Sequence, residues 1–246
     1  FLFMRNYLKY GLLTLVLAGL CLPASAVIFY STGDVSYNTN APTGSLVDSG
    51  WQFQGRFNSY LGTPIGPHHF IAAKHIGGSI GNKFYYGGEV FTTIGKVDDS
   101  GSDLRIWEVE ERFLSYAPLY SSTDESGKDL VVFGRGVDRG VAVTNTYTSG
   151  FGRNQTTVTI TNGWKWGAYN YTQRWGTNKV SAVTTVNGYP VLKADWDSGA
   201  GDNECMLADK DSSGGVFIQQ DGVWKLAGIN YAIGPTWTYS FNSDGS

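Results

Sequence analysis

Short runs of apolar and β-branched residues, separated by turn residues, follow one another along the chain after residue 26. The clearest of these runs cover residues 51–57, 69–73, 83–86, 90–94, 105–109, 130–133, 156–161, 180–186 and 216–220. Their lengths and their Val, Ile, Thr and aromatic content predict β-strands. Long apolar stretches with helical periodicity are absent from the same region. The pattern therefore predicts an all-β protein, built as a barrel or a sandwich.

The clearest predicted hairpin lies near the end of the chain. The apolar run at 216–220 is followed by Asp221-Gly222 and by a second run at 223–229. Asp-Gly favours a tight hairpin turn because both residues tolerate the positive φ angles that such a turn needs. We expect these two runs to pair as antiparallel strands.

A change in composition divides the chain into two parts. Residues 116–129 are polar, rich in turn-forming residues and without periodicity. This composition is typical of a linker between two β-rich halves.

The first 26 residues have the pattern of a secretory signal peptide. Arg5 and Lys9 precede an apolar run at 11–22, and Ala24-Ser25-Ala26 resembles a cleavage site. The apolar run has about 12 residues, and a membrane-spanning helix needs about 20. We therefore expect a secreted protein, extracellular or periplasmic, that starts near Val27 and has no membrane partner after the signal is removed.

The charge of the chain limits the kinds of partner that can be expected, and its cysteine content limits the expected disulfides. The formal net charge of the whole chain is −3, and it becomes about −5 without residues 1–26, which hold two basic residues and no acidic ones. An acidic surface argues against binding to nucleic acid or anionic membranes. Cys205 is the single cysteine beyond residue 26, so no internal disulfide is expected there. We expect its side chain to be buried.

The segment Lys210-Asp211-Ser212-Ser213-Gly214-Gly215 carries a candidate nucleophile. An acid, serines and small residues stand directly before an apolar run, which is typical of a serine held on a tight turn. A serine hydroxyl reacts poorly by itself and needs a base within hydrogen-bond distance. Ser212 and Ser213 are the two candidates for this role.

Histidine is the base expected to activate such a serine, and the chain has three histidines. His75 follows an apolar run and precedes two glycines, whereas His68 and His69 stand beside Pro67 and are expected in a loop. A carboxylate must orient the base. Asp103 is favoured for this role because an apolar run begins directly after it, and Asp98 and Asp99 are its rivals.

These three segments resemble those of the chymotrypsin/trypsin-like serine proteases. That family has Ala-Ala-His-Cys at its base, Asp-Ile-Ala-Leu at its acid and Gly-Asp-Ser-Gly-Gly-Pro at its nucleophile. The counterparts here are residues 73–76, 103–106 and 210–215, and they occur in the family's order of His, Asp and Ser. The resemblance covers roughly residues 51–233.

The resemblance implies a fold of two antiparallel six-stranded β-barrels with the active cleft between them. The N-terminal barrel would cover 27–115 and the C-terminal barrel 130–246, joined by the linker at 116–129. It also implies a monomeric secreted serine endopeptidase that acts on protein or peptide substrates without a cofactor or metal. Only 17 residues follow Ile229, so the family's last strand and terminal helix are expected to be shortened or missing.

The resemblance also assigns roles to individual residues. His75 would accept the Ser212 proton, Asp103 would orient His75, and the backbone N–H groups of Lys210 and Ser212 would form the oxyanion hole. Met206 would lie at the base of the primary substrate pocket. Tyr231 and Ile233 would belong to the backbone edge along which the substrate lies.

Two departures from the family pattern lie in the nucleophile segment, where Lys210 and Ser213 stand at positions that favour glycine. They support an alternative, a catalytically impaired module that binds extended peptides. A new terminus at Val27 is another feature of interest, since it would have to reach Asp211. It lacks the glycines that follow the family's terminus, so this contact is not expected.

Other motifs have less specific interpretations. The acidic segments 98–103 and 195–204 resemble calcium loops in part but are better explained as solvated turns. A zinc pair at His68 and His69 lacks further ligands. An aromatic cluster allows a third function, sugar binding, although packing explains it more simply; its members are Trp164, Trp166, Tyr169, Tyr171 and Trp175.

Overall fold

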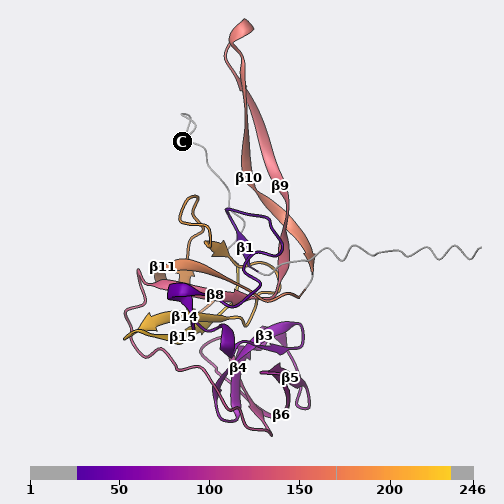
Figure 1. Cartoon of the computed structure of the whole chain (residues 1–246), viewed down its shortest axis with the longest axis vertical. Helices are drawn as coiled ribbons and strands as arrows, with labels where there is room; N and C mark the ends of the chain where they lie inside the picture. The colour runs from indigo at the N-terminus through magenta and orange to yellow at the C-terminus, as the bar shows by residue number, and fades with distance from the viewer. Residues whose placement is uncertain (1–26, 170, 234–246) are drawn as a thin grey trace, which may run out of the picture.

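The computed structural model describes residues 27–169 and 171–233, and its regular structure is mainly β (Figure 1). The predicted signal peptide at 1–26 lies outside the described residues, as does the end of the chain from residue 234. The prediction of an all-β protein is confirmed for the described part. Within that part, no helix is both long enough and apolar enough to cross a membrane.

The first group of strands closes into a six-stranded barrel. Its strands pair antiparallel in the order β2 (Gly55–Phe57), β3 (Tyr60–Gly66), β4 (His69–Ala73), β7 (Leu104–Val109), β6 (Glu89–Asp98) and β5 (Lys83–Tyr86). Closure leaves no free strand edge in this part of the fold. The expected N-terminal barrel is therefore present.

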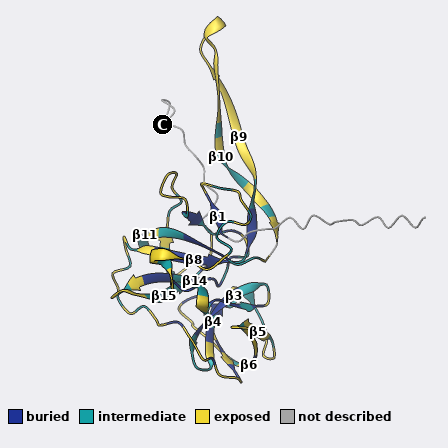
Figure 2. Cartoon of the chain, viewed as in Figure 1, coloured by how far each residue is buried: buried dark blue, intermediate teal, exposed yellow. Residues whose placement is uncertain are grey.

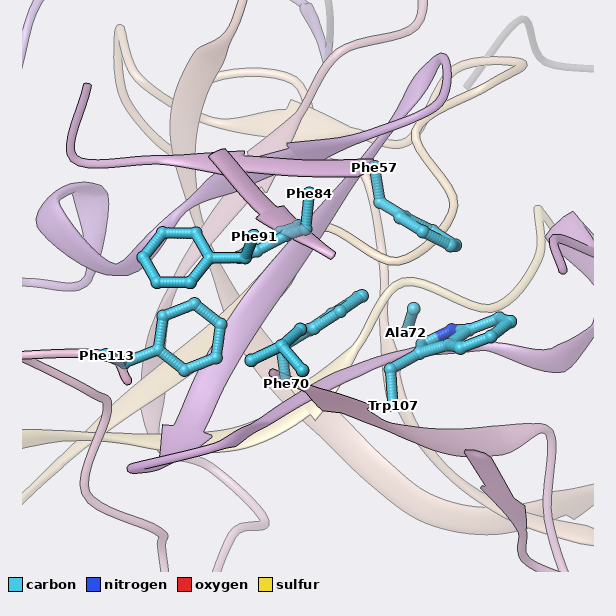
Figure 3. Packing of buried hydrophobic residues seen from close by; sticks show 8 residues of the cluster. Phe57, Phe70, Ala72, Phe84, Phe91, Trp107 and Phe113 are labelled. Atoms are coloured by element: carbon cyan, nitrogen blue, oxygen red, sulfur yellow. The ribbon is translucent and has the colours of Figure 1, made fainter. Parts of the chain in front are cut away.

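Aromatic side chains fill the interior of this barrel (Figure 3). The buried rings are those of Phe57, Phe70, Phe84, Phe91, Trp107 and Phe113. Phe70 and Phe84 stack with their ring centroids 4.1 Å apart. Gly55 makes room for this packing, because a Cβ atom at that position would lie 2.2 Å from the Phe84 ring. Burial of this much apolar surface is the main stabilising contribution in this half.

The second half forms an open sheet. Five strands pair in the order β12 (Tyr189–Ala194), β11 (Arg174–Val186), β8 (Asp129–Gly134), β14 (Gly215–Gln220) and β15 (Val223–Ile229). The expected hairpin at Asp221-Gly222 joins β14 to β15. The expected second six-stranded barrel is not closed in the described residues. The reason is that the two strands that follow β8 in the chain pair with each other instead of adding to this sheet.

Those two strands, β9 (Val137–Ser149) and β10 (Thr156–Tyr169), form a hairpin that projects from the rest of the molecule (Figure 1). Most of its residues are exposed (Figure 2). Cross-strand threonine pairs cover one face, as shown by Thr148 opposite Thr157 and Thr146 opposite Thr159. We call this hairpin the arm.

A shared apolar layer joins the closed barrel to the open sheet. Leu61 of the barrel packs in one buried cluster with Phe133 and Phe217 of the open sheet. The short strand β1 (Ile28–Phe29) lies outside the barrel and pairs with β13 (Cys205–Met206), a few residues before Ser212. The contacts in the apolar layer fix the two halves against each other around the segments that carry the candidate site.

Most predicted strands are confirmed, and the exceptions have local causes. The stretch 51–57 is divided, because Trp51–Phe53 forms a 3-10 turn and only Gly55–Phe57 is extended. Strands β1, β3, β9, β12 and β13 were not predicted. Between β7 and β8 the chain has no strand, apart from an isolated bridge of Leu119 to Leu226. The predicted linker lies in this region, and its role as a domain boundary stays a prediction.

Candidate active site

The ends of two neighbouring barrel strands bring His75 and Asp103 together. Strands β4 and β7 pair with Ala73 opposite Leu104, so the residues just beyond β4 and just before β7 are adjacent. His75 Nδ1 lies 2.5 Å from Asp103 Oδ2, and the His75 backbone N–H donates to Asp103 Oδ1 at 3.2 Å. Asp103 therefore holds both the ring and the backbone of His75. The rivals are elsewhere: Asp98 pairs with Arg105, and Asp99 accepts from Ser102.

Ser212 reaches the other side of the same imidazole. It lies on the turn between β13 and β14, and its Oγ is 2.7 Å from His75 Nε2. The His75 side chain is 40% exposed and that of Asp103 13% exposed. The cluster is thus open to solvent on the histidine side and shielded on the carboxylate side. An imidazole that bridges a carboxylate and a hydroxyl can accept the hydroxyl proton.

Ser213, the alternative candidate nucleophile, is buried and forms structural hydrogen bonds. Its side chain is completely buried, and its Oγ accepts the Ala73 backbone N–H at 2.8 Å. Its own N–H donates to the carbonyl oxygen of Asn230. This serine therefore links the nucleophile turn to the end of β4, directly beside His75, and faces away from the solvent.

A buried carboxylate anchors the turn on which Ser212 lies. Asp211 Oδ1 accepts the Gly136 N–H at 2.8 Å, and Oδ2 accepts the Ala208 N–H at 2.6 Å. Oδ2 also accepts the Val27 N–H at 3.0 Å. The expectation that Val27 would not reach Asp211 was therefore wrong. The antiparallel pairing of β1 with β13 brings Val27 to this point, without any need for glycines after it.

Burial raises the pKa of Asp211 to about 7, although backbone N–H groups oppose the shift. A carboxylate removed from water is costly when charged, and hydrogen bonds to the charged form recover only part of that cost. A positive charge brought close to Asp211 would therefore stabilise its ionised form.

Two residues of this turn have backbone angles that are unfavourable for residues other than glycine. Lys210 has φ of 73° and Ser213 has φ of 71°. Both values lie in the left-handed region, which is costly for residues other than glycine. Gly214 is a true requirement, because a Cβ atom there would lie 1.8 Å from the Phe133 carbonyl oxygen. In the described residues, no backbone hydrogen bond uses the N–H of Lys210 or Ser212.

A cavity of about 170 Å³ opens beside Ser212 and is lined by residues 207–212 and 231–233. Tyr231 and Ile233 belong to this lining and form no strand; their role as a substrate-binding edge stays a prediction. Met206 does not belong to it. It lies in β13 opposite Ile28 and packs on the cluster of Ile28, Val137 and Ala208. Its role at the base of a substrate pocket stays a prediction.

The other candidate motifs have ordinary structural roles. His68 Nδ1 contacts the Glu111 carbonyl oxygen, and His69 begins β4. The segment 98–103 is a turn closed by Asp99. No group of three or more metal-ligating side chains occurs in residues 27–169 and 171–233. Cys205 is buried, and burial raises its pKa.

The aromatic residues proposed for sugar binding do not share one surface. Trp175 is buried in the layer between the two halves. Trp164 packs edge-on against Tyr30 and lies under the Arg139 guanidinium. Tyr169 and Tyr171 stack on each other near the base of the arm. The contact of Trp164 with Tyr30 connects the arm to the segment after β1.

Sequence reasoning missed several residues around the cluster. Asn230 is buried, and its side chain donates to the carbonyl oxygens of Asp211 and Phe133. Asn187 and Tyr189 reach the site from the turn between β11 and β12. The sequence signal for that turn was Asn187-Gly188 between two β-rich runs. Nothing in the sequence pointed to Asn230.

The chain matches no protein-family model and no curated protein. Among solved structures, it is similar to the passenger domain of plasmid encoded toxin, an autotransporter enterotoxin from enteroaggregative Escherichia coli. The sequence identity is 15% and the TM-score is 0.46, over 75% of this chain. The chain spans about a fifth of that passenger domain, since 20% of its length is covered. Similarity at this level assigns neither fold nor activity.

Proposed function

We propose that this protein is a secreted serine endopeptidase of the chymotrypsin/trypsin-like kind, with Ser212 as nucleophile, His75 as base and Asp103 as the orienting acid. One observation carries the proposal: His75 makes hydrogen bonds to Asp103 Oδ2 at 2.5 Å and to Ser212 Oγ at 2.7 Å. Three residues far apart in the sequence thus form one chain of hydrogen bonds next to a cavity.

The proposed reaction begins when Ser212 Oγ attacks the carbonyl carbon of a peptide bond and gives its proton to His75 Nε2. His75 then passes this proton to the leaving amine as the C–N bond breaks, which leaves an acyl group on Ser212. A water molecule then attacks this acyl group, with His75 again accepting a proton, and the carboxylic acid product leaves Ser212, which regains its proton from His75. Asp103 keeps the proton on His75 Nδ1 and stabilises the charged ring.

The backbone N–H groups of Lys210 and Ser212 are the proposed oxyanion hole. Two features support this role: neither donates to a backbone carbonyl in the described residues, and Lys210 has the positive φ that glycine would adopt readily. Buried Asp211 stands between them in the sequence and restrains the turn. Prearranged donors of this kind are worth on the order of 100- to 1000-fold each in turnover.

The proposed substrates are extended protein or peptide segments, bound by a monomer without a cofactor. The pattern of residues 1–26 supports export before the enzyme acts. The hydrogen bond from Val27 N to Asp211 supports a role for the new terminus. Cleavage before Val27 would give an α-ammonium group beside this buried carboxylate, where its charge would stabilise the ionised form and favour the ordered turn.

A fluorophosphonate probe tests the proposal, because it reacts covalently with activated serines. We expect labelling of the folded protein, its loss in Ser212→Ala and its retention in Ser213→Ala. His75→Ala should also abolish labelling, whereas His69→Ala should not. Asp103→Asn should slow turnover on the order of 10⁴-fold, the size known for the enzymes that define this triad. A folded protein that resists the probe would instead support the non-catalytic peptide-binding module.

A further inference from the structure

Asp209, the residue before Lys210, is held by both strands of the arm. Val137, the first residue of β9, donates its backbone N–H to the Asp209 carbonyl oxygen at 2.9 Å. Tyr169, the last residue of β10, donates its hydroxyl to Asp209 Oδ2 at 2.6 Å. Val137 and Tyr169 lie opposite each other in the hairpin. One cross-strand pair at the base of the arm thus holds both the main chain and the side chain of Asp209.

The base of the arm lies close against the nucleophile turn. Gly136, just before β9, makes room for this approach, because a Cβ atom there would lie 2.2 Å from the Asp209 carbonyl oxygen. The Lys210 ammonium lies 5.9 Å from the centroid of the Tyr169 ring, so Tyr169 faces two consecutive residues of the turn. The hydrogen bond to Asp209 raises the pKa of Tyr169 above its ordinary value. The hydroxyl therefore stays protonated, and remains a donor, through the neutral pH range.

The carbonyl group of Asp209 and the N–H of Lys210 belong to one peptide unit. This unit is trans, so the two groups point in opposite directions. Because the carbonyl oxygen accepts the Val137 N–H, the Lys210 N–H is directed away from the base of the arm. Rotation of the unit would present an acceptor where a developing oxyanion needs a donor. The use of the Lys210 N–H in the proposed oxyanion hole therefore depends on how Asp209 is held.

We propose that Tyr169 is a positioning residue for the oxyanion hole, which acts through Asp209 and not on the substrate. This inference rests on the proposed function and deepens it. Lys210 has φ of 73°, and such a conformation persists only where the surrounding contacts maintain it. Without the Tyr169 hydroxyl, the Lys210 N–H is correctly directed in only part of the molecules. We expect kcat to fall about 3- to 10-fold, the size of one hydrogen bond, with KM within about twofold of the native value.

The first test removes the hydroxyl alone. The measured quantities are kcat and KM on a mixed peptide pool, and the rate and final extent of fluorophosphonate labelling. Tyr169→Phe should lower kcat and the labelling rate about 3- to 10-fold, with full final labelling. Tyr171→Phe is the matched control, because its ring stacks on Tyr169 and is equally exposed, at 43%. This control should change neither kcat nor the labelling rate.

The second test asks whether Tyr169 acts through Asp209. Asp209→Ala removes the acceptor and should reproduce the loss in kcat, whereas Asp209→Asn keeps an acceptor oxygen and should restore most of it. The double variant with Tyr169→Phe and Asp209→Ala should be no slower than either single variant, because the two changes remove the same interaction.

The possible outcomes separate this inference from the proposed function. A native chain that neither reacts with the probe nor cleaves peptides overturns both. A native chain that reacts, with Tyr169→Phe labelled at the native rate, overturns the role of Tyr169 and leaves the endopeptidase intact. The role is also overturned by a change in KM alone, by a lower final extent of labelling at the native rate, or by additive losses in the double variant. If Tyr169→Phe fails to fold, equal rates in Asp209→Asn and Asp209→Ala contradict the proposal.

Discussion

The closed barrel and the open sheet contribute to the candidate site in different ways. The barrel supplies His75 and Asp103 from the ends of two paired strands, so ordinary antiparallel register brings them together. The open sheet supplies Ser212 from a turn with two non-glycine residues at positive φ, restrained by a buried carboxylate. The first arrangement follows from regular structure, and the second depends on anchoring contacts.

The two halves also differ in whether their sheets have free edge strands. Closure leaves the barrel without edges and surrounds a core of aromatic rings. The open sheet ends in β12 and β15, and the arm leaves it altogether. We therefore expect substitutions in the barrel core to act on stability, whereas substitutions in the turn change how well the site is held, and those in the arm beyond its base do little.

The largest effect is expected in the barrel core. Phe70→Ala removes a completely buried ring and should lower the free energy of unfolding by about 3–5 kcal/mol, measured by urea denaturation. Phe151→Ala, at a ring that is 98% exposed on the arm, is the matched control and should stay within about 0.5 kcal/mol. Equal losses would remove the distinction between barrel and arm.

The next effect concerns Asp211 and pH, in the chain that still carries residues before Val27. The pKa of Asp211 in the folded protein is about 7, above the ordinary value of 3.8 for an aspartate side chain. Between these values the folded state binds more protons than the unfolded state. The contribution of Asp211 to stability is therefore fully present below about pH 4 and is lost as pH rises to 7, by about 1.4 kcal/mol per pH unit.

Urea unfolding from pH 4 to 7 measures this dependence, and the curve of Asp211→Asn isolates it from other carboxylates. We expect the difference between the two curves to change in the direction given above. A chain that begins at Val27 should have a smaller slope, because its α-ammonium group stabilises the charged carboxylate. Parallel curves for the native chain and Asp211→Asn would mean that Asp211 titrates as it does in the unfolded state.

A smaller effect separates the two neighbouring serines. Ser213→Ala leaves the Ala73 N–H without its acceptor inside the protein, and should cost about 1–3 kcal/mol of unfolding free energy. Ser212→Ala should cost less than about 1 kcal/mol and yet abolish probe labelling. The pair is compared by thermal unfolding and labelling on the same samples. Loss of labelling in a folded Ser213→Ala, with retention in Ser212→Ala, would reverse the roles assigned here.

The smallest effect tests the strained turn itself. Lys210→Gly relieves a φ of 73° but adds freedom to the unfolded chain, so we expect a gain of about 0.5 kcal/mol. Lys165→Gly, in strand β10, should instead lose about 0.5–1 kcal/mol, because glycine weakens a strand. Urea denaturation of both variants gives the signs. A loss in Lys210→Gly would show that the lysine side chain stabilises the turn.

The class of fold and the residues of the candidate cluster could be predicted from the sequence. A run of apolar and β-branched residues is a local property, and such runs predicted strands such as 69–73 and 83–86 with the bounds that the structure has. The choice of His75, Asp103 and Ser212 depended on short motifs, in which the residue types and their order can be read directly. Each of these signals lies within a few residues of chain.

Tertiary structure alone decided what depends on pairing over long distances. Whether β9 and β10 join the second sheet or leave it as an arm is set by competition between strands, which no local pattern reveals. Pairing of β1 with β13 brought Val27 to Asp211. Burial of Ser213 against Ala73 assigned the two serines different contacts. The hydrogen bonds of Val27 and Ser213 join residues 184 and 140 positions apart, and sequence spacing holds no record of such contacts.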